Sequence, residues 1–544
     1  MPDALPDFLP TQAEELKRLG IDQLDVLLIT GDAHVDHPAF PANLLGRWLE
    51  AFGFRVGLVA RPRPDHPEDL QVMGPPRLFV GITAGALDSL VANRTALGKK
   101  RSDDAYAPGG QAGGRPDRAL TAYGQLTRRA FGKSVLIVAG GLEASLRRFG
   151  HYDFWSDKIR RSVLMDCGAD LLVHGMGEGP ILGLAQRLAD METQDRQERL
   201  TNLRDLPGLV YRLPRSTPEP ESGTALPNFE EVASDMGRYA ESFKLQERHR
   251  HDRMWQDVAG MRVVANAPHA PLTQSEMDKL YGLPFRREAH PMYGDKAVPA
   301  LEQVRFSVTS HRGCAGGCAF CAITSHQGLR ISSRSEASVL AEIERMVRHP
   351  AFRGTVNDVG GPTANMYGVQ CKGPAKCQRS SCLWPKTCPN LEVPQKAYSK
   401  LLSRARATAK IKHLFVTTGI RTDLLKGQPG LLAALVRHHT SGHFKVAPEH
   451  LDEGVLRHMR KPTAQSFLDL HRDFTPLSAK AGKRQYLLPY FMAAHPGCRL
   501  EDMLEPALFL RRHNIRAEQV QIFTPTPGTA ATVMYASGID PATG

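Results

Sequence analysis

Three cysteines within eight residues constrain this chain more than any other feature of its sequence. They are Cys314, Cys318 and Cys321, in the spacing CxxxCxxC. Three thiolates so spaced can hold three corners of a cubic [4Fe-4S] cluster, and the fourth iron then stays open to a ligand that can react. Gly316 and Gly317 stand between the cysteines and give the backbone the freedom to wrap a cluster. The spacing therefore predicts a cluster loop with an open iron.

The sequence on either side of this loop predicts an α/β setting. Residues 304–309 alternate toward β-branched and aromatic side chains, which indicates a strand before the loop. After the loop, Val339, Ile343 and Val347 recur at helical spacing, with Ser335 or Ser338 as the expected cap. We therefore expect the loop at the carboxyl end of a strand, where α/β folds place their active sites.

A structural zinc site is the alternative for the same cysteines. His311 or His326 lies near enough in sequence to supply a fourth ligand. Structural zinc sites usually separate two pairs of ligands instead of gathering three thiols in one short segment. The spacing therefore favours an iron–sulfur cluster.

The CxxxCxxC loop resembles that of the radical S-adenosylmethionine (SAM) superfamily. Residues 30–38, 103–110 and 140–148 are similar to the YgiQ family of radical SAM proteins, and this resemblance covers nearly the whole chain. It implies a partial (β/α)6 TIM-type barrel of the methylthiotransferase kind. It also implies a [4Fe-4S] cluster, SAM, and a reducing electron donor such as a flavodoxin or ferredoxin. In that superfamily, one-electron reduction splits SAM into methionine and a 5′-deoxyadenosyl radical.

The same resemblance implies the residues that bind SAM. Gly360 and Gly361 are similar to the glycine pair that receives the methionine amino group, although a glycine pair is also an ordinary turn. Arg421 and Glu449, at predicted strand ends, are candidates for the SAM carboxylate and ribose hydroxyls, with surface ion pairing as the alternative. Gly528 lies in a segment that resembles the loop after the sixth strand.

The N-terminal part reads as a doubly wound parallel sheet. Short apolar runs alternate with helical patterns, which is typical of parallel strands joined by helices. The runs are residues 24–30, 55–60, 78–82, 134–139 and 170–174. This part resembles a cobalamin-binding module, but His37 stands where the cobalt-ligating motif that begins Asp32-Ala-His34 has a glycine. We therefore expect that cobalamin is not bound and that His34 and His37 form a hydrogen-bonded pair at a strand end.

These patterns predict a domain order. We expect a cobalamin-binding-like domain, a connecting strand, linker and helical region, a radical SAM barrel and a short tail. Their boundaries are 1–190, 191–300, 301–535 and 536–544. A loop over 101–118 is expected above the crevice of the first domain, with Tyr106 and Arg115 as candidate substrate contacts.

A second group of cysteines lies in a loop inserted in the predicted barrel, over 371–388. Its members are Cys371, Cys377, Cys382 and Cys388. Four thiols in eighteen residues suit a second [4Fe-4S] cluster or a zinc site, with unligated reduced thiols as the alternative. Cys167 and Cys498 stand alone and are predicted to be packing residues.

Composition narrows the setting. Nine cysteines, an odd number, argue against a secreted disulfide framework. No apolar run reaches membrane-spanning length, so we expect a cytoplasmic protein without a membrane partner. A formal net charge of +12 suits a polyanionic partner such as RNA, although basic clusters are also ordinary solvated faces.

These observations predict a radical SAM enzyme that modifies an unidentified substrate, RNA or protein. The competing hypothesis is a non-catalytic RNA-binding or redox-sensing protein that carries a metal cluster or zinc. The two differ in whether SAM is cleaved.

Overall fold

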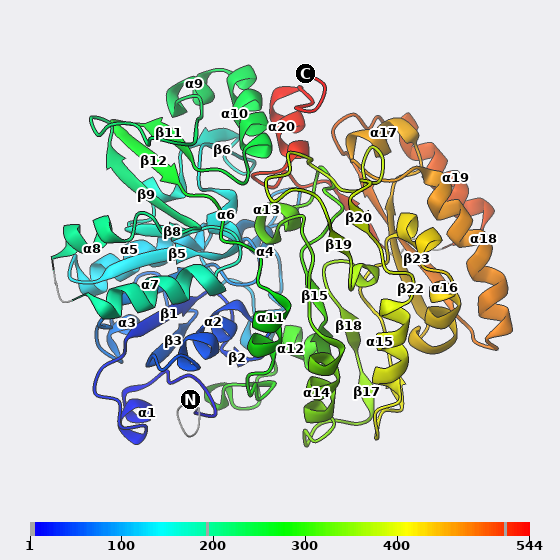
Figure 1. The fold of residues 1–544 in the computed structure, drawn as a ribbon, viewed down its shortest axis with the longest axis horizontal. Coiled ribbons are helices and arrows are strands. Elements are labelled where there is room, and N and C mark those ends of the chain that lie inside the picture. Colours follow the sequence, from blue (N-terminus) through cyan, green and yellow to red (C-terminus); the bar gives the residue numbers. More distant parts are fainter. Residues whose placement is uncertain (1–5, 192–194, 516–518) are drawn as a thin grey trace. The chain divides into compact units, whose positions relative to one another are not determined.

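The structure, a computed structural model, describes residues 6–191, 195–515 and 519–544. The chain forms two compact units, each built from two segments (Figure 1). Unit 1 contains Met1–Ala270 and Leu283–Arg305, and unit 2 contains Pro271–Gly282 and Phe306–Gly544. Among the described residues, no helix combines the length and apolar character needed to cross a membrane.

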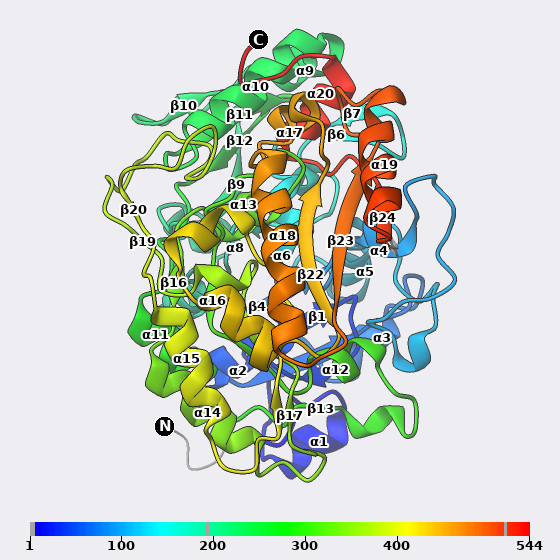
Figure 2. The ribbon, with the colours of Figure 1, turned by 90° about the vertical axis from the view of Figure 1, so that its right-hand side faces the viewer.

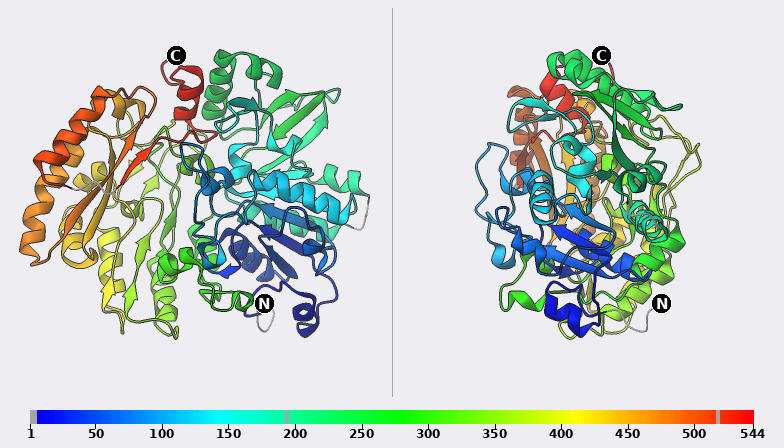
Figure 3. Two further views of the ribbon diagram at one scale, coloured as in Figure 1. Left: turned by 180° about the vertical axis from the view of Figure 1, so that it is seen from behind. Right: turned by 90° about the vertical axis from the view of Figure 1, so that its left-hand side faces the viewer.

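Unit 1 is organised by a nine-stranded sheet in the order β10-β11-β12-β9-β8-β5-β4-β1-β3. Five neighbouring strands are parallel, and they confirm the five predicted strands to within two residues. They are β1 (Val26–Thr30), β3 (Val56–Ala60), β4 (Phe79–Thr83), β5 (Leu136–Gly140) and β8 (Leu171–Val173). Helices cover both faces of this sheet (Figures 1 and 3).

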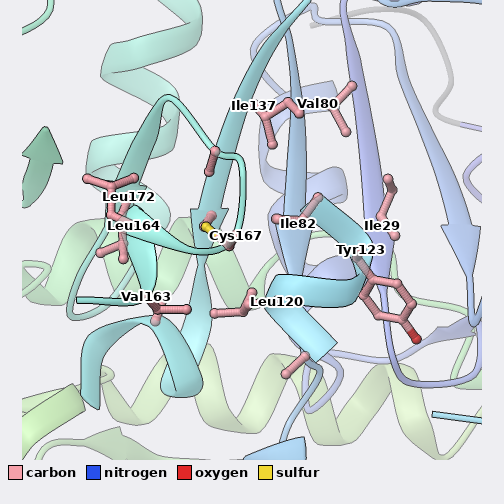
Figure 4. Close-up of a cluster of buried hydrophobic side chains, with 14 of the residues drawn as sticks. Ile29, Val80, Ile82, Leu120, Tyr123, Ile137, Val163, Leu164, Cys167 and Leu172 are labelled. Carbon is pink, nitrogen blue, oxygen red and sulfur yellow. The ribbon is translucent and has the colours of Figure 1, made fainter. Parts of the chain in front are cut away.

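The parallel strands are buried on both faces because alternate side chains enter two different cores. One core joins Ile29, Ile82 and Ile137 to helix α5 (Ala119–Phe131), and Figure 4 shows Leu120 and Tyr123 of this helix against the strands. The other core joins the opposite side chains to helices α2 (Pro41–Glu50) and α7 (Glu178–Asp190). The predicted doubly wound arrangement is thus confirmed.

Cys167 belongs to the first of these cores. Its side chain is fully buried beside Val163, Leu164 and Leu172 (Figure 4). Burial raises the pKa of this thiol to about 11. Cys167 is therefore a packing residue, as predicted.

Residues 191–300 differ from the connection expected there. This segment extends the sheet with further strands, of which β9 runs antiparallel to β8 and β12 antiparallel to β9. They are β9 (Leu209–Pro214), β10 (Thr224–Ala225), β11 (Met254–Val258) and β12 (Met261–Ala265). The helical region expected within this segment is formed by two helices, α9 (Phe229–Ser234) and α10 (Met236–Arg248). The alternating residues of β11 and β12 form a hairpin because Ala259 and Gly260 adopt positive φ between them.

The loop over 101–118 contains a 3-10 turn, η1 (Pro108–Gly110), between irregular segments. Arg115 is fully buried and pairs with Asp32 at 2.8 Å and Asp104 at 3.5 Å. Its prediction as a substrate contact is wrong, because both carboxylates that it neutralises are inside the unit. The carbonyl of Tyr106 accepts a hydrogen bond from the amide of Ala33 at 2.8 Å. The loop is therefore anchored to the carboxyl end of β1.

Unit 2 contains successive parallel strands that follow one another as in a partial barrel. β14 pairs with β18, β17 with β21, and β22 with β23 and β24, while a parallel bridge between Ile420 and Val446 links the middle of the series. The strands are β14 (Ser307–Thr309), β17 (Thr355–Val356), β18 (Asp358–Gly360), β21 (His413–Leu414), β22 (His443–Glu449), β23 (Tyr486–Ala493) and β24 (Gln519–Ile522). The predicted partial barrel is confirmed.

Helices alternate with these strands and cover them. They include α14 (Glu336–Met346), α15 (Ala397–Arg406), α16 (Leu431–Ala434), α18 (Ala464–Lys480) and α19 (Leu504–Arg512). Figure 2 shows α18 along β22 and β23, where Phe467 and Phe474 enter the same core as Phe444 and Phe491. This core fixes the strand ends from which the site is built.

Candidate functional site

The three closely spaced cysteines lie in a loop between two short strands. β15 (His311–Arg312) pairs antiparallel with β16 (Ser332–Ser333), and helix α13 (Ile323–Gln327) begins two residues after Cys321. The amide of Cys314 donates to the carbonyl of Gly328 at 3.1 Å, which closes the base of the loop. The loop follows β14, as predicted. Of the two candidate caps, Ser335 precedes α14 and accepts from the amide of Ser338.

Gly316 forms a cradle for the cysteine sulfurs. A Cβ added there would stand 3.4 Å from Cys314 Sγ, 3.7 Å from Cys318 Sγ and 3.0 Å from Arg421 Nη1. The backbone at Gly316 therefore lies against two thiols and a cation, and a side chain added there would press on the guanidinium. Thiolates, close backbone and a nearby cation are the surroundings that an iron–sulfur cluster requires. The residues present thus fit the cluster that the spacing predicts.

Arg421 supplies that cation. Its Nη1 donates to Cys318 Sγ at 3.4 Å, and its Nε and Nη2 grip Asp423 at 3.0 and 2.6 Å. Burial opposes the charged form, but the charges of Asp423 and Cys318 outweigh it and raise the pKa of the guanidinium. A permanently charged donor therefore faces the cysteine loop from the end of the third strand region.

Asn365 fixes the backbone of Arg421. Its Nδ2 donates to the carbonyl of Arg421 at 3.0 Å, and its Oδ1 accepts from the amide of Arg421 at 2.9 Å. Thr363, two residues earlier, has its hydroxyl 3.8 Å from Cys314 Sγ. Sequence reasoning did not single out Asn365, Thr363 or Asp423. The polar residues directly after Gly360 and Gly361 were the available signal for the first two.

The glycine pair after β18 permits close packing beneath the cysteine loop. A Cβ at Gly360 would lie 2.8 Å from Thr418 Oγ1, and one at Gly361 would lie 2.6 Å from the carbonyl oxygen of His311. His311 Nε2 donates to the carbonyl of Thr363 at 2.9 Å. Burial lowers the pKa of His311 to about 4, so the ring is neutral at pH 7. Both ring nitrogens have partners in the protein, because Nδ1 lies 3.0 Å from Ser310 Oγ.

Glu449 ends β22 in an unusual conformation. Its φ is +68°, a left-handed value that non-glycine residues rarely adopt. Burial raises the pKa of this carboxyl, against the effect of Lys461, whose Nζ lies 4.0 Å away. The pKa of Cys321 rises to about 12 through burial first, then through the nearby Cys318, with Glu449 among the smaller causes. Glu449 therefore lies close to the cysteine loop.

The loop after β24 also contacts the cysteine loop. Ser325 Oγ of α13 donates to the carbonyl of Gly528 at 3.0 Å, and the amide of Ala531 donates to the carbonyl of Ala319 at 2.9 Å. Gly528 has φ +71°, which favours glycine there. The structure thus brings the predicted residues of the third, fourth and sixth strands to one loop. Their contacts to SAM remain predictions.

The second cysteine group lies against the first. The amide of Cys382 donates to the carbonyl of Ala315 at 3.0 Å, and Ser381 Oγ donates to the carbonyl of Gly316 at 2.6 Å. Within the described ranges, no three His, Cys, Asp or Glu side chains are grouped so as to hold a single metal ion. A cubic cluster distributes its thiolates over several irons, so that finding concerns mononuclear sites.

The two histidines of unit 1 behave differently. His37 accepts from the amide of Ala39 at 3.0 Å, and its Nε2 lies 2.9 Å from Arg287 Nη1. His34 stacks on His290, with ring centroids 4.6 Å apart, and neither of its ring nitrogens has a hydrogen-bond partner among the described residues. The ring of His37 is hydrogen-bonded, as expected, but the expectation is wrong for the ring of His34. Burial lowers the pKa of both rings well below the usual value.

Comparison with protein families assigns the two halves of the chain. Residues 8–307 match the family described as Radical SAM N-terminal, and residues 308–481 match the Radical SAM superfamily. A UPF0313 protein of Geobacter sulfurreducens is 50% identical over 99% of this chain and 89% of that protein. A UPF0313 protein of Methanosarcina acetivorans is 43% identical over 99% of this chain and 76% of that protein.

Solved structures support the fold. The radical SAM methyltransferase TsrM from Kitasatospora setae, with tryptophan and a SAM analogue bound, has a TM-score of 0.51 at 16% identity, and the match covers 92% of this chain and 74% of that chain. A second structure of TsrM, with cobalamin and a [4Fe-4S] cluster bound, has a TM-score of 0.48 at 16% identity over 92% of this chain and 76% of that chain. The expectation that cobalamin is not bound is unsupported by these comparisons. The matches over both halves, together with relatives of high identity along the whole chain, place this protein in the UPF0313, or YgiQ, family of radical SAM proteins.

Proposed function

We propose that this radical SAM enzyme holds a [4Fe-4S] cluster on Cys314, Cys318 and Cys321 and cleaves SAM reductively to modify an RNA or protein substrate. The observation that carries the proposal is the convergence of strand ends on the cysteine loop. Arg421 follows the third strand, Glu449 ends the fourth, and the loop after the sixth strand hydrogen-bonds to the loop itself. Converging strand ends are where barrel enzymes build their active sites.

When bound, the cluster and SAM supply the radical chemistry, and the protein supplies binding and orientation. Three cysteines as ligands leave one coordination position for SAM. Arg421, held in place by Asp423 and Asn365, presents a fixed positive charge beside Cys318 and suits the SAM carboxylate. Glu449, buried at the end of β22, suits the ribose hydroxyls.

The backbone at Gly360 and Gly361 suits the methionine end of SAM. Both glycines stand where side chains would collide with neighbours, which keeps the carboxyl end of β18 next to His311 and the cysteine loop. Carbonyl oxygens at a strand end accept hydrogen bonds from an ammonium group. Gly528 adds a further backbone segment at the cysteine loop, where its carbonyl accepts from Ser325 Oγ.

The proposed substrate is RNA or protein, and the proposed electron donor is a flavodoxin or ferredoxin. The net charge of +12 supports a polyanionic substrate. Retention of RNA on the immobilised protein at low and high salt tests this part, because phosphate contacts weaken as salt rises. Salt-independent retention, or none at low salt, contradicts RNA as the substrate and favours protein.

Anaerobic reconstitution with iron and sulfide, followed by reduction with dithionite and addition of SAM, tests the cleavage. The wild-type protein should form 5′-deoxyadenosine and methionine, and Cys318→Ala should form neither. Cys498→Ala is the matched control, because this cysteine lies outside both groups. Cluster-loaded wild type that forms no 5′-deoxyadenosine with reductant would contradict the proposal.

A further inference from the structure

The second cysteine group is gathered by a hairpin whose two ends meet. Strand β19 (Gln370–Cys371) pairs antiparallel with β20 (Leu391–Glu392), so that Cys371 stands opposite Leu391. The amide of Leu391 donates to the carbonyl of Cys388 at 3.0 Å. The first and last cysteines of the group therefore lie at the closed end of the same hairpin, although sixteen residues separate them.

The inner cysteines are folded back toward this end. The amide of Cys388 donates to the carbonyl of Cys382 at 2.8 Å, and both side chains are buried, at 8% and 9% exposure. Burial raises the pKa of Cys382 to about 11, and the thiols of Cys371, Cys388 and Cys377 contribute to the rise. Each of the other three thiols is thus near enough to repel a charge on Cys382. The hairpin thus brings the four cysteines into one loop, with Cys382 and Cys388 buried inside it.

The loop that carries them is braced by its own polar groups. Arg379 donates to the carbonyls of Ser381 at 2.9 Å, Trp384 at 3.3 Å and Lys386 at 2.7 Å. This guanidinium also lowers the pKa of Cys382 against the larger effects of burial and the other thiols. Arg379 therefore places a positive charge inside the loop that carries the four cysteines.

The braced loop packs against the cysteine loop of the proposed SAM site. Besides the two hydrogen bonds from Ser381 and Cys382, the carbonyl of Ser380 would lie 2.3 Å from a Cβ at Gly317. Apolar side chains form one buried cluster with Cys382 and Cys388 where the two loops meet. They are Ala315, Met366, Val369, Leu383 and Leu424. An apolar shell around thiolates that touch a second cysteine loop is a setting for a redox centre.

We propose that Cys371, Cys377, Cys382 and Cys388 bind a second iron–sulfur cluster, with one thiolate on each of four irons. Zinc also accepts four thiolates, but its ligands typically come in pairs separated by about two to four residues. Of the three intervals here, only that between Cys377 and Cys382, with four residues between them, falls in this range. The inference does not rest on SAM cleavage, because it concerns cysteines outside the first group.

The test compares metal content after anaerobic reconstitution with iron and sulfide. One variant removes the first group, Cys314→Ala/Cys318→Ala/Cys321→Ala. Another removes half of the second, Cys382→Ala/Cys388→Ala, and Cys498→Ala is the control. Iron, acid-labile sulfide and zinc are measured per chain, and circular dichroism shows that each variant is folded. Wild type and control should hold about eight iron atoms, and each of the two variants about four.

Iron retained by the first-group variant reports on the second group alone, even if the second-group variant fails to fold. A first-group variant without iron, or with one zinc per chain in place of iron, overturns the inference. So does a folded second-group variant with the full iron content of wild type. Wild type that holds eight iron atoms but forms no 5′-deoxyadenosine would contradict the proposed function. It would not contradict the second cluster.

Discussion

The guanidinium of Arg421 donates to the sulfur of Cys318 at 3.4 Å while it grips Asp423 with its other two nitrogens. One side chain thus ties the cysteine loop to the end of the third strand region. Since the planar guanidinium makes both contacts at once, a lysine cannot replace it.

Arg421→Lys should lower 5′-deoxyadenosine formation about 10- to 100-fold, because a lost hydrogen bond to a charged group costs about 1.5–3 kcal/mol. Iron content should stay at the wild-type level, since the three cysteines remain. Arg472→Lys, at a side chain that is 68% exposed, is the control. Equal rates for Arg421→Lys and the control would exclude Arg421 from the site.

Gly316→Ala should weaken cluster binding. The added methyl would stand 3.4 Å from Cys314 Sγ and 3.0 Å from Arg421 Nη1. Overpacking of this kind costs about 1–3 kcal/mol, so the iron retained against a competing chelator should fall about tenfold. Gly442→Ala is the matched control, because nothing lies within 4 Å of a Cβ there. Equal iron retention by both variants would refute the claim that cluster binding needs a glycine at position 316.

Glu449→Gln should weaken SAM binding about tenfold, because a neutral amide is a poorer acceptor for hydroxyl groups than a carboxylate. Equilibrium binding of SAM to the reconstituted protein measures the change, and iron content serves as the internal check. Glu453→Gln, at an exposed residue of the same region, should bind SAM like wild type. An unchanged affinity for Glu449→Gln would remove this residue from the ribose site.

His151 should make unit 1 sensitive to acid. Burial lowers its pKa from 6.5 to about 3, with a further contribution from Arg147, against the hydrogen bond to the carbonyl of Phe149. Asp153 raises the pKa of this ring and Arg160 lowers it. The folded-state pKa is depressed, so the stabilisation is present above pH 6.5 and is lost as the pH falls toward 3.

The expected loss is about 2 kcal/mol at pH 5, since one pKa unit corresponds to about 1.4 kcal/mol. The unfolding midpoint in guanidinium is measured at pH 7 and at pH 5. Between these values it should decrease more for wild type than for His151→Gln, because the glutamine amide does not titrate. Parallel decreases for the two proteins would show that His151 is not the acid-sensitive group.

The sequence predicted best those elements whose burial follows from the local pattern of apolar residues and does not depend on pairing with distant segments. The strand over 26–30 reads as one apolar run because both of its faces are buried. The hairpin of β11 and β12 was missed because its alternating residues follow a polar segment and pair with β9, about fifty residues earlier in the chain.

The site followed the same rule. CxxxCxxC is local, and it located the cysteine loop directly. The hydrogen bonds between Asn365 and Arg421 join residues fifty-six positions apart, and no local sequence pattern predicts them. The left-handed conformation of Glu449 likewise depends on how β22 ends beside the cysteine loop, which composition and periodicity do not encode.

The open iron is tested most directly by electron paramagnetic resonance of the anaerobically reduced Cys382→Ala/Cys388→Ala variant, which retains the first cysteine group alone. Spectra are recorded with and without SAM. The account predicts that SAM changes the signal, because SAM would bind at the iron that the three cysteines leave free. Identical spectra at saturating SAM would contradict it.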